Sequence, residues 1–144
     1  MTNRDYLLRE IEIPEGVFGL RKDNILHVFL KDDTELNVEL QWKMIHIYDD
    51  LTDKVKTPFI FEANPNVTVT KEARENAVKL EERSAMGSCA VVVKTTAHLL
   101  IANFYYKFNK PKIPYKVFKD FDKAIAWLKT TECYQPQMTL SKIE

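Results

Sequence analysis

The residues most able to carry out chemistry are the histidines and cysteines, which could bind a metal ion or exchange electrons. His27, His46 and His98 show no ligand spacing with one another or with a cysteine. Cys89 and Cys133 each lack the second cysteine of a CxxC motif, which a zinc knuckle or a redox site needs. We therefore expect neither a metal nor a cofactor.

Nucleophiles, phosphate-binding loops and paired carboxylates offer little more. No serine lies in a nucleophile-elbow sequence. The three glycines, Gly16, Gly19 and Gly87, are not clustered as a P-loop or a Rossmann fingerprint requires. The pairs Asp32-Asp33 and Asp49-Asp50 could act in acid–base catalysis, but adjacent acids at helix ends more often cap the helix or face solvent. We expect a protein that is not an enzyme.

The balance of charge argues against a nucleic-acid partner. The chain has 21 lysines and arginines and 21 aspartates and glutamates, whereas nucleic-acid binding depends on clustered cations. One local cluster interleaves lysines with tyrosines: Tyr105, Tyr106, Lys107, Lys110, Lys112, Tyr115 and Lys116. Such a cluster could follow a single nucleic-acid strand, but we expect it to be a solvated helix end beside a sheet edge.

Length and composition are those of one globular domain. The 144 residues are 45% hydrophobic and 29% charged, which is enough apolar material for a core. The first five residues contain no apolar leader region. The most apolar stretch, residues 99–106, is far too short to cross a bilayer. We expect a cytoplasmic protein with no transmembrane segment.

Hydrophobic patterns divide the N-terminal half into strands and a helix. Alternating charged and apolar residues, interrupted by turn-forming residues, predict a β-hairpin within 8–30. The cluster Asp32-Asp33-Thr34 is predicted to cap a helix, because an apolar stripe with helical spacing then runs from Leu36 to Val55. Residues 57–63 contain a short apolar run that suits a buried strand.

The C-terminal half alternates helices with strands. A helix is predicted over 70–86, ended by Gly87 in a left-handed conformation. The β-branched run at 90–94 predicts a strand covered on both faces. The remaining predicted elements are a helix over 97–110, a strand over 114–118, and a last helix that Asp120 caps and in which Trp127 is mostly buried.

This order of elements predicts an α/β fold. An N-terminal hairpin followed by alternating α and β units implies a mixed, mostly parallel sheet with packed helices. The apolar residues expected inside the sheet are Phe59, Phe61, Val91, Val93 and Val117.

Four stretches of the C-terminal half resemble small uncharacterised bacterial proteins with the STAS-like (anti-sigma-factor-antagonist-like, SpoIIAA-like) fold. They are Ala90-Val91-Val92-Val93, Ala102-Asn103-Phe104-Tyr105-Tyr106-Lys107, Pro114-Tyr115-Lys116-Val117-Phe118 and Ala124-Ile125-Ala126-Trp127-Leu128. The resemblance covers residues 8–130, and packing explains each of its markers. It implies a single STAS-like domain over 1–130, followed by a polar C-terminal tail over 131–144.

The function that the resemblance implies is that of a non-catalytic regulatory module. Anti-sigma-factor antagonists act through protein–protein contacts, so we expect a regulatory protein as partner. The alternative is a carrier or sensor of a lipid or other apolar small molecule, as in STAS-like relatives and the related lipid-transfer domains.

Phosphorylation-controlled members of this family carry an Asp-Ser-Ser-Gly motif in one loop, and the corresponding stretch here is 64–70. It runs from Asn64 to Thr70 without a serine or a glycine. Thr68 or Thr70 could take a phosphate near the helix N-terminus. The stronger expectation is that Thr70 simply caps the helix.

The helix predicted over 97–110 is apolar or aromatic on nearly all sides. A helix of this kind is buried on more than one side. The side that carries Leu99, Ala102, Tyr105 and Tyr106 is expected to contact a second copy of the chain in a homodimer. The two alternatives are a helix packed within the core on both sides and the wall of a pocket for an apolar ligand.

Overall fold

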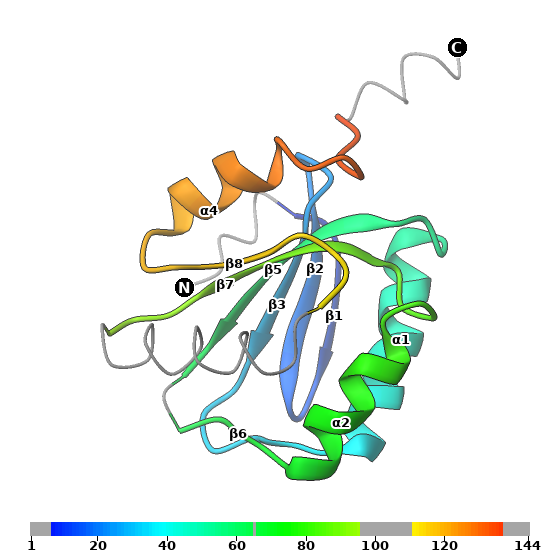
Figure 1. Cartoon of the computed structure of the whole chain (residues 1–144), viewed down its shortest axis with the longest axis vertical. Helices are drawn as coiled ribbons and strands as arrows, with labels where there is room; N and C mark the ends of the chain where they lie inside the picture. The colour runs from blue at the N-terminus through cyan, green and yellow to red at the C-terminus, as the bar shows by residue number, and fades with distance from the viewer. Residues whose placement is uncertain (1–6, 65, 96–110, 137–144) are drawn as a thin grey trace.

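The computed structural model of the chain describes residues 7–64, 66–95 and 111–136. They form a six-stranded sheet with strand order β1-β2-β3-β5-β7-β8, antiparallel over the first three strands and parallel from β3 onward (Figure 1). The strands are β1 (Leu7–Ile13), β2 (Gly16–Arg21), β3 (Leu26–Leu30), β5 (Thr57–Ala63), β7 (Met86–Val92) and β8 (Tyr115–Phe118). The predicted α/β class and mostly parallel sheet are confirmed.

Helices cover both faces of this sheet. Helices α1 (Val38–Thr52) and α2 (Lys71–Leu80) lie on one face, and α4 (Phe121–Leu128) lies on the other (Figure 1). In the part of the chain that the structure describes, no helix is long and apolar enough to cross a membrane. The helix predicted over 97–110 lies outside the described residues.

The cap predicted at Asp32-Asp33-Thr34 is wrong. Asp33 has a φ of 62°, and the Thr34 hydroxyl donates a hydrogen bond to the Glu15 carbonyl, so these residues form a turn. The short strand β4 (Glu35–Leu36) follows, and α1 begins after Asn37, whose Oδ1 accepts a hydrogen bond from the Leu40 N–H at 2.8 Å. The helix therefore starts three residues later than the acidic cluster suggests.

Strand β4 pairs in parallel with β6 (Thr68–Val69), and this small ladder fixes where the two helices begin. The Thr70 N–H donates to the Leu36 carbonyl at 3.0 Å. Helices α1 and α2 each start directly after their strand, so their N-termini lie next to each other. The buried side chain of Gln41 then joins the helices, because its Nε2 donates to the Ala73 carbonyl at 2.8 Å.

Gly87 does not end a helix. Helix α2 ends at Leu80, and Gly87 lies within β7 without a positive φ. A Cβ atom at this position would lie 2.7 Å from the Cys133 Sγ and 3.2 Å from the Lys56 Cβ. Glycine is needed here because two neighbouring segments approach the strand closely.

Two apolar clusters lie on the two faces of the sheet. The larger cluster joins α1 and α2 to the sheet and includes the fully buried Phe18 and Phe59. The smaller cluster joins α4 to the sheet and includes Leu128. Among the residues expected inside the sheet, Phe59 and Val117 are buried, whereas Phe61, Val91 and Val93 are half-buried.

Helix α4 begins as predicted and packs its apolar face against the sheet. Asp120 caps it, and its Oδ1 accepts a hydrogen bond from the Lys123 N–H at 2.9 Å. Trp127, predicted to be mostly buried, packs against the smaller apolar cluster, and its ring centroid lies 5.7 Å from that of Phe118. Leu128, on the same apolar face, is fully buried.

Residues at the start of the predicted polar tail pack against the domain. The Thr131 hydroxyl lies 2.9 Å from the Oγ of Ser88, which is fully buried in β7. Tyr134 packs against the smaller apolar cluster. This segment is therefore part of the packed structure up to at least Tyr134.

Candidate functional site

Ligands of parallel α/β sheets usually bind at the carboxyl ends of the strands, where the strand order reverses and leaves a crevice. In the described sheet, β3, β5, β7 and β8 follow one another in a single direction. The connecting helices α1 and α2 lie on the same face. This arrangement has no reversal among the described strands, so it does not generate a crevice of that kind.

Asn64 follows the carboxyl end of β5, at this edge of the sheet. Asn64 accepts a hydrogen bond on its Oδ1 from the Lys94 Nζ at 3.2 Å. Thr68 is exposed, and its N–H donates to the Thr34 carbonyl at 3.0 Å within the β4–β6 ladder. The Thr70 hydroxyl accepts the Ala73 N–H at 3.0 Å, so Thr70 is the N-cap residue of α2, as expected.

The predicted interface residues, Leu99, Ala102, Tyr105 and Tyr106, lie outside the described residues. The candidate metal ligands and nucleophiles are not brought together. Among the residues that the structure describes, no three histidine, cysteine or acidic side chains are placed to hold a metal ion. Burial raises the pKa of the Cys89 thiol to about 12, so this thiol stays protonated at neutral pH.

The structure does bring together one pair that the sequence does not predict. The His27 Nε2 and the Glu62 Oε2 lie 2.7 Å apart on the face of the sheet that α4 covers. The His27 ring is 4% exposed and contacts Phe121 edge-on, at 5.5 Å between ring centroids. The sequence places one polar residue within each of two apolar strands, which is a signal for a buried polar pair. The two residues are 35 positions apart, so the sequence does not show that they meet.

This pair is better suited to holding α4 than to catalysis. The hydrogen bond from His27 holds the pKa of Glu62 below its usual value. Arg21 lies over the ring of Phe121 at 5.3 Å and pairs with Asp23, so Phe121 is enclosed by the His27 ring and a guanidinium. The pair therefore anchors the first turn of α4 to the sheet.

The lowered pKa of Glu62 predicts a pH dependence of stability. Because the folded-state pKa lies below the unfolded value, the contribution is present above about pH 4.5 and is lost as the pH falls through the folded-state pKa. Glu62→Gln should lower the free energy of unfolding by about 1 kcal/mol at pH 7 and flatten its decline in acid. Urea unfolding from pH 7 to pH 3 measures both effects.

The control is Glu75→Gln, at an exposed position of α2, which should change neither the free energy of unfolding at pH 7 nor its decline in acid. A pH profile of Glu62→Gln parallel to that of the unmodified protein would contradict the role of Glu62 in this pH dependence.

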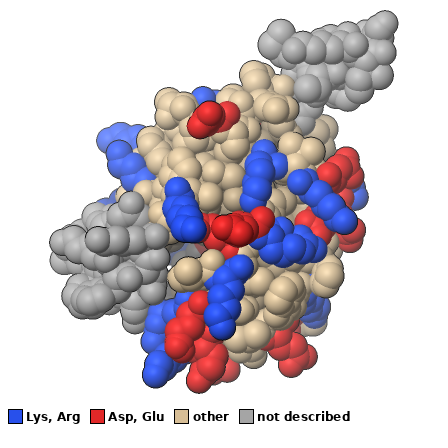
Figure 2. Space-filling view, turned by 45° about the vertical axis from the view of Figure 1, so that its right-hand side comes forward, with Lys and Arg blue, Asp and Glu red and all other residues tan. Residues whose placement is uncertain are grey.

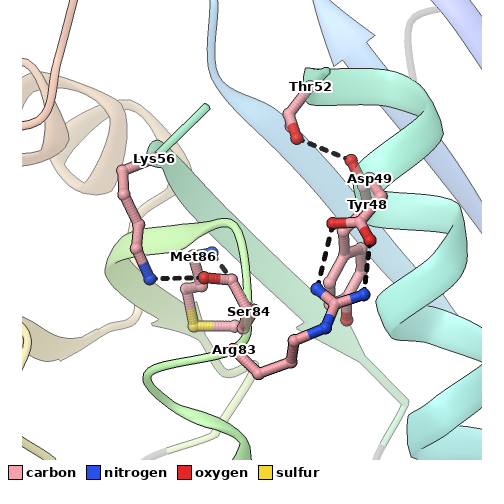
Figure 3. Close-up of polar contacts among 7 residues, drawn as sticks. All are labelled: Tyr48, Asp49, Thr52, Lys56, Arg83, Ser84 and Met86. Atoms are coloured by element: carbon pink, nitrogen blue, oxygen red, sulfur yellow. Dashed lines mark hydrogen bonds and ion pairs between the residues drawn. The ribbon is translucent and has the colours of Figure 1, made fainter. Parts of the chain in front are cut away.

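A second polar cluster ties the end of α1 to the segment that follows α2 (Figure 3). The Arg83 guanidinium binds both carboxylate oxygens of Asp49, at 2.7 and 3.4 Å, and holds the pKa of Asp49 below its usual value. The Lys56 Nζ donates to the Ser84 carbonyl, and the Ser84 hydroxyl oxygen accepts the Met86 N–H at 3.1 Å. Asp49, expected to cap a helix or face solvent, is instead part of an ion pair.

An open pocket of about 280 Å³ lies beside this cluster, lined by Lys56, Glu81, Glu82, Lys112 and Ile113. The Glu81 Oε1 accepts two backbone N–H groups, from Lys112 at 2.7 Å and from Ile113 at 3.2 Å. These contacts fasten the segment before β8 to the end of α2. The pocket is open to solvent, whereas small-molecule sites usually enclose most of the surface of their ligand.

The solvent side of the α1–α2 layer carries large exposed apolar residues. Trp42 on α1 is 43% exposed, Val69 on β6 is 41% exposed and Val78 on α2 is 54% exposed. Lysine, arginine and acidic side chains are interspersed with uncharged surface on the side of the molecule that is turned forward in Figure 2. An exposed tryptophan on a helix is the feature of this layer that packing within the domain does not explain.

Comparisons with known proteins show the family and the fold. A family model described as a domain of unknown function (DUF7793) matches residues 18–132. No curated protein matches the chain. The chain is similar to the crystal structure of an uncharacterised protein of the DUF3478 family with a SpoIIAA-like fold from Shewanella loihica PV-4. The TM-score is 0.51 at 11% sequence identity, over 83% of this chain and 90% of that chain.

Proposed function

The chain belongs to the DUF7793 family, and we propose that it is a non-catalytic binding module that acts through protein–protein contacts. The similarity to a SpoIIAA-like structure establishes the fold alone, because folds of this kind do not determine function. The proposal includes a cytoplasmic location, no cofactor and no nucleic acid. It depends on the surface of the α1–α2 layer.

The exposure of Trp42 is the observation that carries the proposal. Tryptophan is enriched at the centres of protein interfaces, where one large ring buries much area at a small cost in conformational entropy. Trp42 is 43% exposed in this chain, and Val78 on the neighbouring helix is 54% exposed. A partner that covers these side chains would remove apolar surface from water on both helices.

The α1–α2 layer is also suited to binding because its helices are held together before any partner arrives. Gln41 donates to the Ala73 carbonyl and accepts a hydrogen bond from the Asn76 Nδ2 at 3.0 Å. The ion pair between Asp49 and Arg83 joins the end of α1 to the segment that follows α2. A surface that is already ordered loses little conformational freedom on binding, which favours affinity.

Site-specific photocrosslinking in the source cell tests the proposal. With a photoreactive phenylalanine analogue in place of Val78, we expect a discrete crosslinked product that is lost when Trp42→Ala is added. The control places the analogue at Lys123, an exposed position on α4 on the opposite face of the sheet, and should give no such product. A product at both positions, or one that is unaffected by Trp42→Ala, would contradict the proposal.

The mass of the crosslinked product identifies the kind of partner. A doubled chain mass indicates a contact between two copies of the chain at the α1–α2 layer, and a different mass indicates a separate protein, such as a regulatory partner. Native mass spectrometry of the purified chain addresses the alternative of a lipid or apolar-ligand carrier. A defined small ligand mass on the monomer, without any crosslink at the α1–α2 layer, would favour the carrier over the binding module.

A further inference from the structure

The segment that contains α1 is strongly acidic, although the whole chain has no net charge. Residues 32–53, from the turn before β4 to the C-cap of α1, contain seven acidic residues and one lysine. Six of the seven are exposed: Asp32, Asp33, Glu35, Glu39, Asp50 and Asp53. Within the described ranges of the chain, none of these six carboxylates forms an ion pair or accepts a hydrogen bond.

Trp42 lies within this acidic surface. Along α1, Glu39, Trp42, His46, Asp50 and Asp53 follow one another at steps of three or four residues, so they form one stripe on the helix, the α1 stripe. All five residues are exposed. The α1 stripe therefore has an uncovered tryptophan ring with carboxylates before and after it along the helix.

Three cations around α1 are already engaged. The Lys43 Nζ lies 3.4 Å from the Glu15 Oε1, and Arg83 binds Asp49. Arg9 donates a hydrogen bond, at 2.8 Å, to a backbone carbonyl in the last turn of α1. The carboxylates of the α1 stripe therefore remain available to charges from outside the chain.

We infer that the partner of the α1–α2 layer is a separate protein that presents a basic segment to the α1 stripe, an inference that rests on the proposed function. Complementary charges speed association and select the correct partner. The face of a tryptophan ring also attracts guanidinium and ammonium groups. An arginine of the partner could stack on Trp42 and pair with Glu39, one turn away on the same stripe.

A second copy of the chain fits this surface less well. A two-fold dimer brings the same surface of both copies together, so one acidic stripe would face another. Like charges placed opposite each other cost binding free energy. Helix α2 does not compensate, because its exposed charged residues are two lysines and two glutamates: Lys71, Glu72, Glu75 and Lys79.

Two labelled peptides test the charge of the partner. Both are amphipathic helices with one apolar face, and the other face carries arginines in one peptide and glutamates in the other. By fluorescence anisotropy, the arginine peptide should bind about tenfold more tightly than the glutamate peptide, and Trp42→Ala should weaken its binding by about tenfold. The difference between the peptides should shrink in about 0.5 M salt, because salt screens exposed charges.

A matched pair of double variants tests the position of the charge. Glu39→Gln with Asp50→Asn removes two carboxylates of the α1 stripe and should weaken the arginine peptide by about fivefold. The variant should keep its fold, because a negative charge stabilises the first turn of a helix and destabilises the last. The control, Asp122→Asn with Glu132→Gln, removes two exposed carboxylates in and after α4 and should leave the affinity nearly unchanged.

Equal binding of the two peptides, or equal losses in the two double variants, would overturn the inference. A crosslinked product at Val78 that has a doubled chain mass, or whose partner segment has no net positive charge, would overturn it too, while the proposed binding module would stand. If no product forms at Val78, the proposed function fails. Tighter binding of the arginine peptide to the unmodified α1 stripe than to its neutralised variant would then still support a basic occupant.

Discussion

Replacing Phe59 with alanine is expected to lower the free energy of unfolding by about 3–5 kcal/mol. Phe59 is fully buried in β5, and its ring meets the Tyr48 ring edge-on at 4.7 Å between centroids. It lies in the larger apolar cluster, which α1 and the sheet enclose. The neighbouring side chains can therefore collapse only partly into the space that the ring leaves. Urea unfolding, followed by circular dichroism, measures the change.

Phe61→Ala is the matched control for this prediction. Phe61 lies on the same strand and on the same face, with its ring centroid 6.2 Å from that of Phe59, but it is half-buried. Its replacement should cost clearly less than the replacement of Phe59. Equal losses for the two variants would show that burial of Phe59 is not the cause.

Leu128→Ala is expected to lower the free energy of unfolding by about 2–5 kcal/mol. Leu128 is fully buried between α4 and the sheet, together with Ala124. Helix α4 has eight residues, which is too short to be stable in water without its packed face. The loss should therefore also appear as faster amide hydrogen exchange within α4.

Trp127→Ala is the control for Leu128. Trp127 packs against the smaller apolar cluster and Phe118 but is not fully buried, whereas Leu128 is. We therefore expect a loss of roughly 1–2 kcal/mol. A loss for Trp127→Ala larger than that for Leu128→Ala would contradict the packing described for α4.

Local patterns predicted most of the fold because the forces behind them act over a few residues. Alternation and β-branched runs identified the strands, and Thr70 and Asp120 were recognised as N-caps from the helical residues that follow them. The start of α1 was misplaced because the two-residue strand β4 is stabilised by β6, more than 30 positions away. Gly87 was misread because its requirement comes from Cys133, on a distant segment.

The candidate sites depended on such distant contacts, so sequence alone could not assemble them. His27 and Glu62 meet only because β3 and β5 pair in parallel. The contact between Lys56 and the Ser84 carbonyl depends on a turn after α2, where the sequence predicts a helix over 70–86. Trp42 is different, because the apolar stripe predicted from Leu36 to Val55 does not include it, and the structure leaves it 43% exposed.

The order of strands in the sheet also bears on how the chain can fold during synthesis. Each strand of the six-stranded sheet pairs with the strand of that sheet that precedes it in sequence, from β1 to β8. The sheet can therefore grow at one edge as residues leave the ribosome, and no later strand has to be inserted between two that are already paired. The antiparallel strands β1 to β3 need only short-range contacts and can form first, providing the template onto which β5, β7 and β8 dock in turn.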